Sequence, residues 1–106
     1  MSIFNFFSNR SDFASAVEQA KNTPGAVLLD VRTVQEYADG HVPGSVNLPL
    51  ERLESIQLNK SNPVFVYCRS GARSRQACLY LRANGYSVTD IGGIADYRGK
   101  LAKGIK

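Results

Sequence analysis

Two short runs of apolar residues mark the centre of the chain. Residues 26–31 (Ala-Val-Leu-Leu-Asp-Val) and 64–67 (Val-Phe-Val-Tyr) are almost continuously apolar, without alternating polar positions. Strands that are buried on both faces have this pattern, and they belong to parallel sheets covered by helices. The first run therefore predicts a central parallel strand that ends in charge, and the second predicts the strand before a polar loop.

Segments with helical spacing lie on either side of these runs. A first helix is predicted to begin at Ser11-Asp12 and to end at Thr23-Pro24-Gly25, with four apolar residues at the spacing of one helix face. These residues are Phe13, Ala14, Val17 and Ala20. Before this helix, residues 1–10 are compatible with an edge strand or with a helical turn.

Capping residues predict two further helices. Thr33 and Glu36 have the spacing of a capping box, so a short helix is expected there, with Tyr37 facing inward. Ser74 is a good N-cap for a longer helix that closes at Gly85.

The remaining elements are shorter. The sequence predicts strands at 45–48 and 86–91, a polar helix at 50–58, a sharp turn at Gly92-Gly93 and a short helix at 94–98. The alternation of strands and helices predicts an α/β fold, with a central parallel sheet of four to five strands and helices on both faces. A length of 106 residues fits one domain, 1–106, with its core at about 11–99. The tail, 101–106, is expected to dock as a half-turn or to fray.

A thiol stands where the second apolar run ends. Cys68 is followed by a short loop that contains Gly71 and two arginines, Arg69 and Arg73, and then by the predicted helix start. Backbone N–H groups of such a loop, together with a helix N-terminus, form a pocket that favours negative charge. A thiol held there loses its proton readily, and the thiolate is a nucleophile. Cys68 is therefore the candidate catalytic residue.

The second cysteine fits a different role. Cys78 is predicted to lie on the same helix face as Leu81, as a small core residue, and a resolving thiol is the minority interpretation. Two cysteines at this spacing predict neither a disulfide scaffold nor a metal site.

Other polar residues near the predicted strand ends have structural explanations. Asp30 and Arg32 follow the first apolar run and are expected to form an ion pair or to bond a turn. His41 is the only histidine, and it is expected to bond the backbone of its turn rather than to act as a base.

Composition and charge restrict the partners. The hydrophobic share is 43%, the charged share 21% and the net charge +4, values of an ordinary globular protein with a mildly basic surface. No apolar run reaches the roughly 20 residues of a membrane span, and no nucleic-acid motif is present. We expect no membrane or nucleic-acid partner, and the absence of a secretory leader favours the cytoplasm.

Three stretches together resemble the rhodanese-like domain. They are LLDVR, EY and GHVPGSVNLP within residues 28–49, VFVYCRSGARS at 64–74, and Gly92-Gly93 with Tyr97 and Gly99. Their order and spacing cover nearly the whole chain. The family often has tryptophan where this chain has Tyr97, and either aromatic residue serves the same packing need.

The resemblance implies a sulfurtransferase. Cys68 would take sulfane sulfur from a small anionic donor such as thiosulfate, hold it as a persulfide, and pass it to cyanide or a thiol. Arg73 is the second catalytic candidate, and it would either face the pocket or tie the loop to an acid. The substrate-binding candidates are Arg69, expected to point outward, with Ser70, Gly71 and Ala72. No cofactor and no metal are implied, a monomer is expected, and a protein is a further candidate acceptor.

Three alternatives remain beside this interpretation. Cysteine phosphatases, and arsenate reductases of similar design, have five residues between cysteine and arginine. Here four residues, 69–72, separate Cys68 from Arg73, so the loop is too small for that chemistry. A non-catalytic docking module would not need the intact cysteine loop. A persulfide carrier for a partner protein is a variant of the main interpretation.

Overall fold

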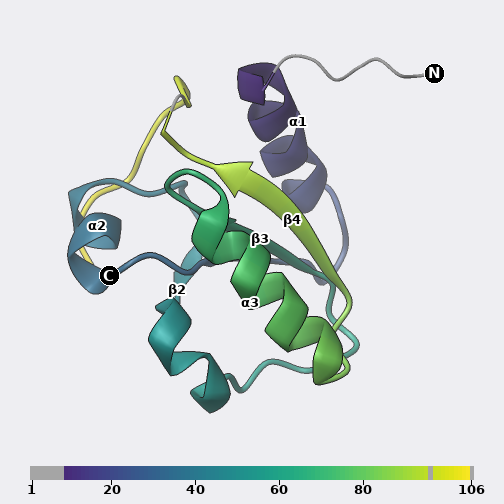
Figure 1. Ribbon diagram of the computed structural model, residues 1–106. Coiled ribbons are helices and arrows are strands. Elements are labelled where there is room, and N and C mark those ends of the chain that lie inside the picture. The colour runs from purple at the N-terminus through teal and green to yellow at the C-terminus, as the bar shows by residue number, and fades with distance from the viewer. Residues whose placement is uncertain (1–8, 96, 106) are drawn as a thin grey trace.

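A four-stranded parallel sheet forms the centre of the computed structural model, which describes residues 9–95 and 97–105 (Figure 1). The strands are β1 (Val27–Asp30), β2 (Val46–Asn47), β3 (Val64–Cys68) and β4 (Val88–Gly93). Their order is β2-β1-β3-β4, and every neighbouring pair is parallel. The two apolar runs thus form the two central strands, and the predicted α/β class is confirmed.

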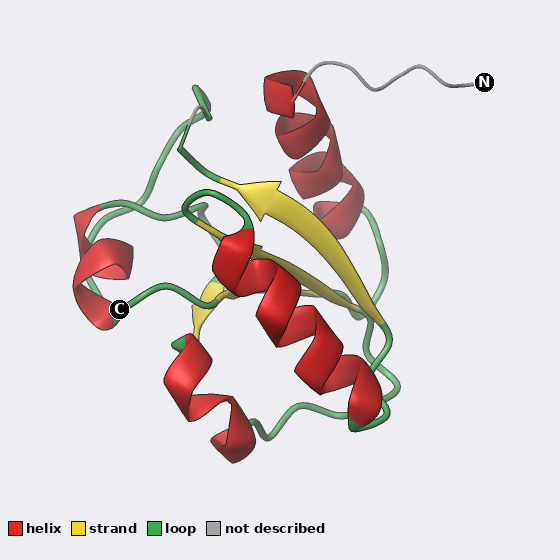
Figure 2. Cartoon of the chain, viewed as in Figure 1, coloured by secondary structure: helices red, strands yellow, loops and turns green. Residues whose placement is uncertain are grey.

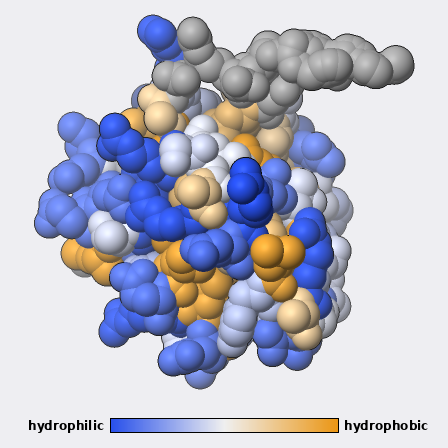
Figure 3. Space-filling model, viewed as in Figure 1, coloured by the Kyte–Doolittle hydropathy of each residue, from blue (hydrophilic) through white to orange (hydrophobic). Residues whose placement is uncertain are grey.

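Helices cover both faces of the sheet, as predicted (Figure 2). One face packs against α1 (Asn9–Lys21), and the other against α3 (Ala72–Ala83) and the 3-10 helix η1 (Leu50–Ser55). The short helix α2 (Val34–Asp39) connects β1 to β2. The face that α3 crosses is mostly hydrophilic, with separate apolar patches (Figure 3).

The side chains of β3 point alternately to the two faces of the sheet and so contribute to two separate parts of the core. Phe65 and Tyr67 pack with Phe13 and Val17 of α1. The other set of β3 residues packs on the side of α3 and η1: Val64, Val66 and Cys68. All five residues of β3 are buried, which explains the absence of polar positions in this run. The Cys68 side chain therefore lies on the α3 face of the sheet.

A buried ion pair closes the end of β1. The Asp30 carboxylate is completely buried and accepts from Arg32 Nε at 3.1 Å and from Arg32 Nη2 at 2.8 Å. Arg32 Nη2 also donates to the Gly40 carbonyl oxygen at 2.7 Å. Burial opposes the charge on Arg32, but the hydrogen bonds and charge of Asp30 outweigh burial and raise the pKa of the guanidinium. The expected ion pair is confirmed, and it fixes the chain between β1 and the turn after α2.

The predicted cap of the long helix is wrong. Gly71, with φ +107, is the N-cap of α3, and the first helical bond runs from Arg75 N–H to the Gly71 carbonyl oxygen. The left-handed backbone of Gly71 reverses the chain three residues earlier than a cap at Ser74 would. The Ser74 hydroxyl lies inside the first turn, 3.0 Å from Gly71 O.

The end of the chain also differs from prediction. Gly92 and Gly93 are the last residues of β4 and not a separate turn, because Ile91 is a bulge residue that lets them pair with Tyr67 and Cys68. No helix is found among the described residues of 94–98; a single turn is closed by Tyr97 N–H to Ile94 O at 2.9 Å. The backbone N–H groups of Ile94 and Ala95 bond Cys68 O and Arg69 O, so they are not used to start a helix.

Smaller differences concern element ends. The capping box of α2 and the buried position of Tyr37 are confirmed. The polar helix at 50–58 is the shorter 3-10 helix η1, and the tail forms a single antiparallel bridge between Ala102 and His41 in place of a half-turn. The edge strand or helical turn considered for residues 1–10 falls largely on residues 1–8, outside the described residues.

The buried ion pair gives a stability prediction. Arg32→Ala leaves a buried carboxylate without its partner, so the free energy of unfolding should fall by about 3–5 kcal/mol. Urea unfolding measures this loss, with the exposed Arg52→Ala as the control, which should change stability by about 0.5 kcal/mol or less. A loss for Arg32→Ala as small as that of the control would contradict the proposed role.

Candidate active site

The carboxyl ends of the strands bring the candidate residues to one edge of the sheet. β3 ends at Cys68, and Cys68 is in register with Gly93, the last residue of β4. β1 ends on the same edge at Asp30. In open parallel sheets this edge is where ligands bind.

The Cys68 thiol is enclosed by the loop that follows it. The side chain is completely buried, and Gly71 N–H donates to Cys68 Sγ at 2.9 Å. Because Gly71 has a left-handed backbone, the chain turns back over the sulfur within three residues. The sulfur therefore lies beneath the first turn of α3, facing a backbone donor.

A second glycine lets the loop pack against the sheet. A Cβ atom on Gly93 would lie 2.8 Å from Ser70 Cα and would also overlap with the Arg69 carbonyl oxygen. Two backbone bonds hold this contact, from Ile94 N–H to Cys68 O and from Ala95 N–H to Arg69 O, both at 3.0 Å. The backbone of β4 thus supports the loop directly.

An ion pair holds the loop from the other side. Arg73 donates through Nη1 and Nη2 to Glu36 Oε1 and Oε2, at 2.7 and 3.0 Å. Glu36 Oε1 also accepts Thr33 N–H at 2.9 Å as part of the capping box. The hydrogen bonds from Arg73, with a smaller contribution from Thr33, lower the pKa of Glu36 to about 2, and the same pair raises the pKa of Arg73. Of its two expected roles, Arg73 has the one that ties the loop to an acid.

The first turn of α3 is held to β4 through Asp90. Asp90 Oδ1 lies 2.8 Å from the Ser74 hydroxyl oxygen and accepts Gly92 N–H at 3.0 Å. Sequence analysis did not predict this contact, and no signal indicated it, because Asp90 stands in a strand like any exposed polar residue. The sequence predicted Glu36 only as part of the capping box. The expectation that Arg73 binds an acid was the signal that could have identified Glu36 as its partner.

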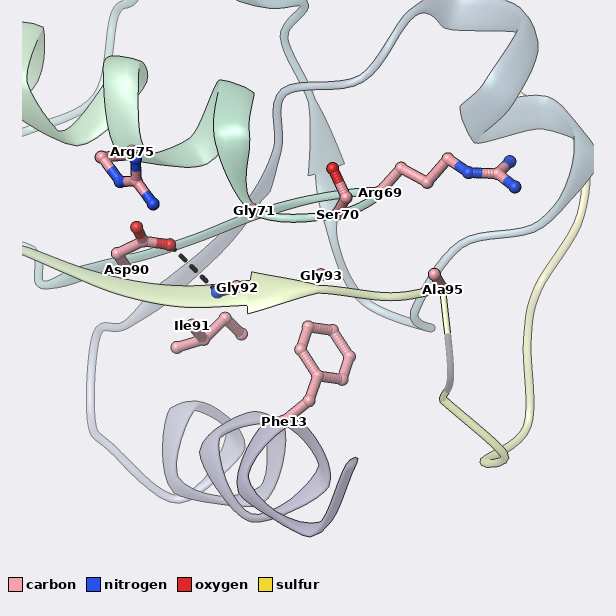
Figure 4. Close-up of a pocket in the computed structure, with 10 residues that line it drawn as sticks. All are labelled: Phe13, Arg69, Ser70, Gly71, Arg75, Asp90, Ile91, Gly92, Gly93 and Ala95. Atoms are coloured by element: carbon pink, nitrogen blue, oxygen red, sulfur yellow. Dashed lines mark hydrogen bonds between the residues drawn. The ribbon is translucent and has the colours of Figure 1, made fainter. Parts of the chain in front are cut away.

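The other loop residues form an open rim. Arg69, Ser70 and Ala72 are exposed, and Arg69 points outward as expected. Beside the loop lies a cavity of about 520 Å³, which β4 crosses between α1 and α3 (Figure 4). Phe13 and Ile91 line it on the α1 side of β4.

Two residues considered for chemistry lie in structural positions. His41 Nδ1 is 2.7 Å from the Tyr37 carbonyl oxygen, and its ring stacks on the Tyr37 ring with centroids 3.6 Å apart. Cys78 is packed in the core, and burial raises the pKa of its thiol to about 11. Both placements agree with the structural roles expected from the sequence.

Neither a metal site nor a membrane span is found in residues 9–95 and 97–105. No three His, Cys, Asp or Glu side chains in this part of the chain are grouped so that they would hold a metal ion. No described helix has the length and apolar character needed to cross a membrane.

Comparison with known proteins identifies the family. Residues 13–100 match the model of the rhodanese-like domain, so the chain belongs to this family. A sulfurtransferase of Allochromatium vinosum is 39% identical over 80 residues, which cover 74% of this chain and 75% of the relative. The thiosulfate sulfurtransferase PspE of Escherichia coli is 37% identical over 81 residues, 72% of this chain and 78% of PspE.

A solved structure gives the same result. A rhodanese with anions from E. coli superposes with a TM-score of 0.66 at 33% identity, over 74% of this chain and 99% of that protein. The family and its relatives identify the chain as a rhodanese-like sulfurtransferase, a protein that transfers sulfur.

The contact between Gly93 and the loop gives a prediction for activity. In Gly93→Ala, the added methyl group must push the loop away from β4, so sulfur transfer should fall at least about tenfold, as expected when a backbone donor is misplaced. A steady-state sulfur-transfer assay measures the loss. Gly44→Ala is the control: its left-handed backbone (φ +89) adds strain that Gly93→Ala does not, but its new methyl group meets open space. Equal losses in both variants would show that a general loss of stability, and not the loop contact, lowers the activity.

The ion pair between Glu36 and Arg73 gives a pH prediction. Glu36→Gln keeps the capping hydrogen bond but loses the charge, so it should be less stable than the natural chain by about 1 kcal/mol at neutral pH. Because the pKa of Glu36 is lowered to about 2 in the folded state, this difference should be complete above the unfolded value of about 4.3. It should disappear as the pH falls from there through about 2.

Urea unfolding of both chains between pH 2 and pH 7 measures the difference. Glu51→Gln, which removes an exposed carboxylate on η1, serves as the control and should show no comparable dependence. A Glu36→Gln difference that stays constant down to about pH 2 would mean that the charge on Glu36 does not hold the loop.

Proposed function

We propose that Cys68 carries sulfane sulfur as a persulfide and transfers it between a small anionic donor and a thiophilic acceptor. The observation that supports this most is the hydrogen bond from Gly71 N–H to Cys68 Sγ at 2.9 Å, beneath the first turn of α3. A backbone donor and the positive end of a helix both favour negative charge on the sulfur, which the attacking thiolate requires.

The first half-reaction loads the cysteine. With thiosulfate as donor, the Cys68 thiolate attacks the outer sulfur, a new S–S bond forms, and the S–S bond of thiosulfate breaks. Sulfite leaves with the electron pair of that bond, and Cys68 becomes a persulfide anion. The name of the E. coli relative PspE supports thiosulfate as the donor.

The second half-reaction returns the thiolate. Cyanide attacks the outer sulfur of the persulfide, thiocyanate leaves, and the electron pair of the broken S–S bond remains on Cys68. A thiol acceptor does the same and becomes a persulfide. The cycle requires neither a redox cofactor nor a metal.

The loop residues have different proposed roles in this cycle. Arg69 and Ser70, exposed on the rim, attract and hold the anionic donor, and the backbone of Gly71 and Ala72 faces the transferred sulfur. Arg73 acts as a positioning residue through Glu36, and its charge adds to the positive field at the sulfur. Since Cys68 is completely buried, the donor reaches the sulfur only when the exposed rim residues move aside.

Loop size supports sulfur over phosphate as the transferred group. Four residues, 69–72, close the loop between Cys68 and Arg73, and the Arg73 guanidinium is already bound to Glu36. A phosphoryl group has three equatorial oxygens that need donors around them, and the loop offers no free guanidinium at that position.

The two cysteines give the direct test. Cys68→Ser should abolish thiosulfate:cyanide transfer and the gain of one sulfur in intact mass after thiosulfate. Cys78→Ser should keep most of both, because Cys78 is packed in the core and burial raises the pKa of its thiol to about 11. Near-neutral pH leaves such a thiol protonated.

Circular dichroism of each variant controls for unfolding. Equal loss of activity in two folded variants would contradict the proposal and favour a mechanism that uses both thiols. A Cys68→Ser variant that still gains a cyanide-labile sulfur would place the persulfide on another residue.

A further inference from the structure

One long edge of the sheet lacks a neighbouring strand. β4 pairs only with β3, and no described residues pair with its other side. The opposite edge of the sheet, β2, has only two residues, and a short edge strand offers little to a pairing partner. β4 has six residues, and Thr89 and Asp90 in it are exposed. Alternate backbone N–H and C=O groups of such an edge point away from the sheet.

This edge runs through the cavity beside the catalytic loop (Figure 4). The cavity volume of about 520 Å³ lies in the range of sites that hold an organic ligand, and it is large for a single sulfur anion. Phe13 and Ile91 form an apolar wall on one side of the edge, and Arg75 and Asp90 lie on the other. At its loop end the edge lacks side chains, because β4 finishes with two glycines.

The rim of the cavity carries two cations without a partner among the described residues. The exposed guanidinium groups of Arg69 and Arg75 make no hydrogen bond or ion pair within residues 9–95 and 97–105. Arg75 lies beside Asp90 at the cavity, and Arg69 extends from the loop past the cavity's loop end (Figure 4). The other arginines near the site are engaged: Arg32 with Asp30, and Arg73 with Glu36. Among the described residues that line the cavity, two arginines stand against one carboxylate, Asp90, and this balance favours an acidic ligand.

We infer that this edge of β4 binds an extended, acidic, cysteine-containing segment of a partner protein, which pairs with the strand and takes sulfur from Cys68. The inference rests on the proposed persulfide of Cys68. The backbone pairing supplies affinity, as in other complexes in which a peptide adds a strand to a sheet. Arg75 at the cavity and Arg69 past its loop end select acidic side chains. The half-buried Ile91, backed by the buried Phe13, contacts an apolar one.

The transfer step balances without an added oxidant. The partner's thiol attacks the outer sulfur of the Cys68 persulfide, and a new S–S bond forms on the partner. The S–S bond to Cys68 breaks, and its electron pair remains on Cys68 as thiolate. The proton of the partner's thiol ends on the transferred sulfur.

Two synthetic peptides of equal length test the charge preference. Both contain one cysteine and one apolar residue; one has glutamates at the other polar positions, and the second has lysines there. The protein is first loaded with thiosulfate, and loading is checked by intact mass and by discharge to cyanide. Discharge to each peptide is then compared for the natural chain, Arg75→Glu and Lys21→Glu. Lys21→Glu is the control: it makes the same change of charge at the C-terminal end of α1, beside a different cavity.

The natural chain should discharge to the acidic peptide roughly tenfold faster than to the basic one at low salt, because charges on the rim act on association rates. Arg75→Glu should reverse this preference, and Lys21→Glu should preserve it. Equal rates with both peptides, or equal effects of both substitutions, would overturn the inference while the persulfide itself still forms. Failure to load with thiosulfate would instead contradict the proposed function.

Backbone pairing has its own test. Two forms of the acidic peptide carry N-methyl groups on alternate residues, in opposite phases. One form should lose most of its rate, because its donors to β4 are blocked, and the other should keep it. Equal rates for both forms would exclude strand pairing. A second copy of the chain could occupy the same edge, and sedimentation of the protein alone tests this alternative. A dimer that Arg75→Glu disrupts would assign the edge to a second copy and overturn the inference.

Discussion

The backbone contact between the end of β4 and the loop after Cys68 determines the geometry of the site. Gly93 has no side chain, so the Arg69 carbonyl and Ser70 approach the strand where a Cβ atom would lie. With the loop at this depth, Gly71 turns its N–H onto the sulfur. The bulge at Ile91 is part of the same arrangement, because it shifts the register so that Gly93, and not Gly92, pairs with Cys68 at the end of β3.

Charged contacts hold the loop from its other sides. Glu36 caps α2 and binds Nη1 and Nη2 of Arg73, so one carboxylate connects a short helix to the first turn of α3. Asp30 and Arg32 fix the chain that leads into α2. The loop is thus positioned by β4 below and by α2 at its side, and the exposed residues Arg69 and Ser70 remain available to ligands.

Much of the fold could be predicted from local patterns. The first apolar run identified β1 as a central strand and the second identified β3 as a strand. The spacing of Thr33 and Glu36 identified the cap of α2, because each of these signals lies within a few residues. The place of Cys68, the candidate nucleophile, at the end of β3 followed from the second apolar run. What local patterns missed depends on contacts between distant segments. Ser74 has the sequence of a cap, but Gly71 turns the chain first, and the contact of Ser74 with Asp90 joins residues that no local pattern relates.

A high-resolution crystal structure of the protein after treatment with thiosulfate tests the central claim most directly. The account predicts one additional sulfur atom bonded to Cys68 Sγ, within hydrogen-bond distance of the backbone N–H groups at the start of α3, with Arg73 still bound to Glu36. An additional sulfur on Cys78, a bond between the two cysteines, or a sulfur on Cys68 that points away from these N–H groups would contradict it.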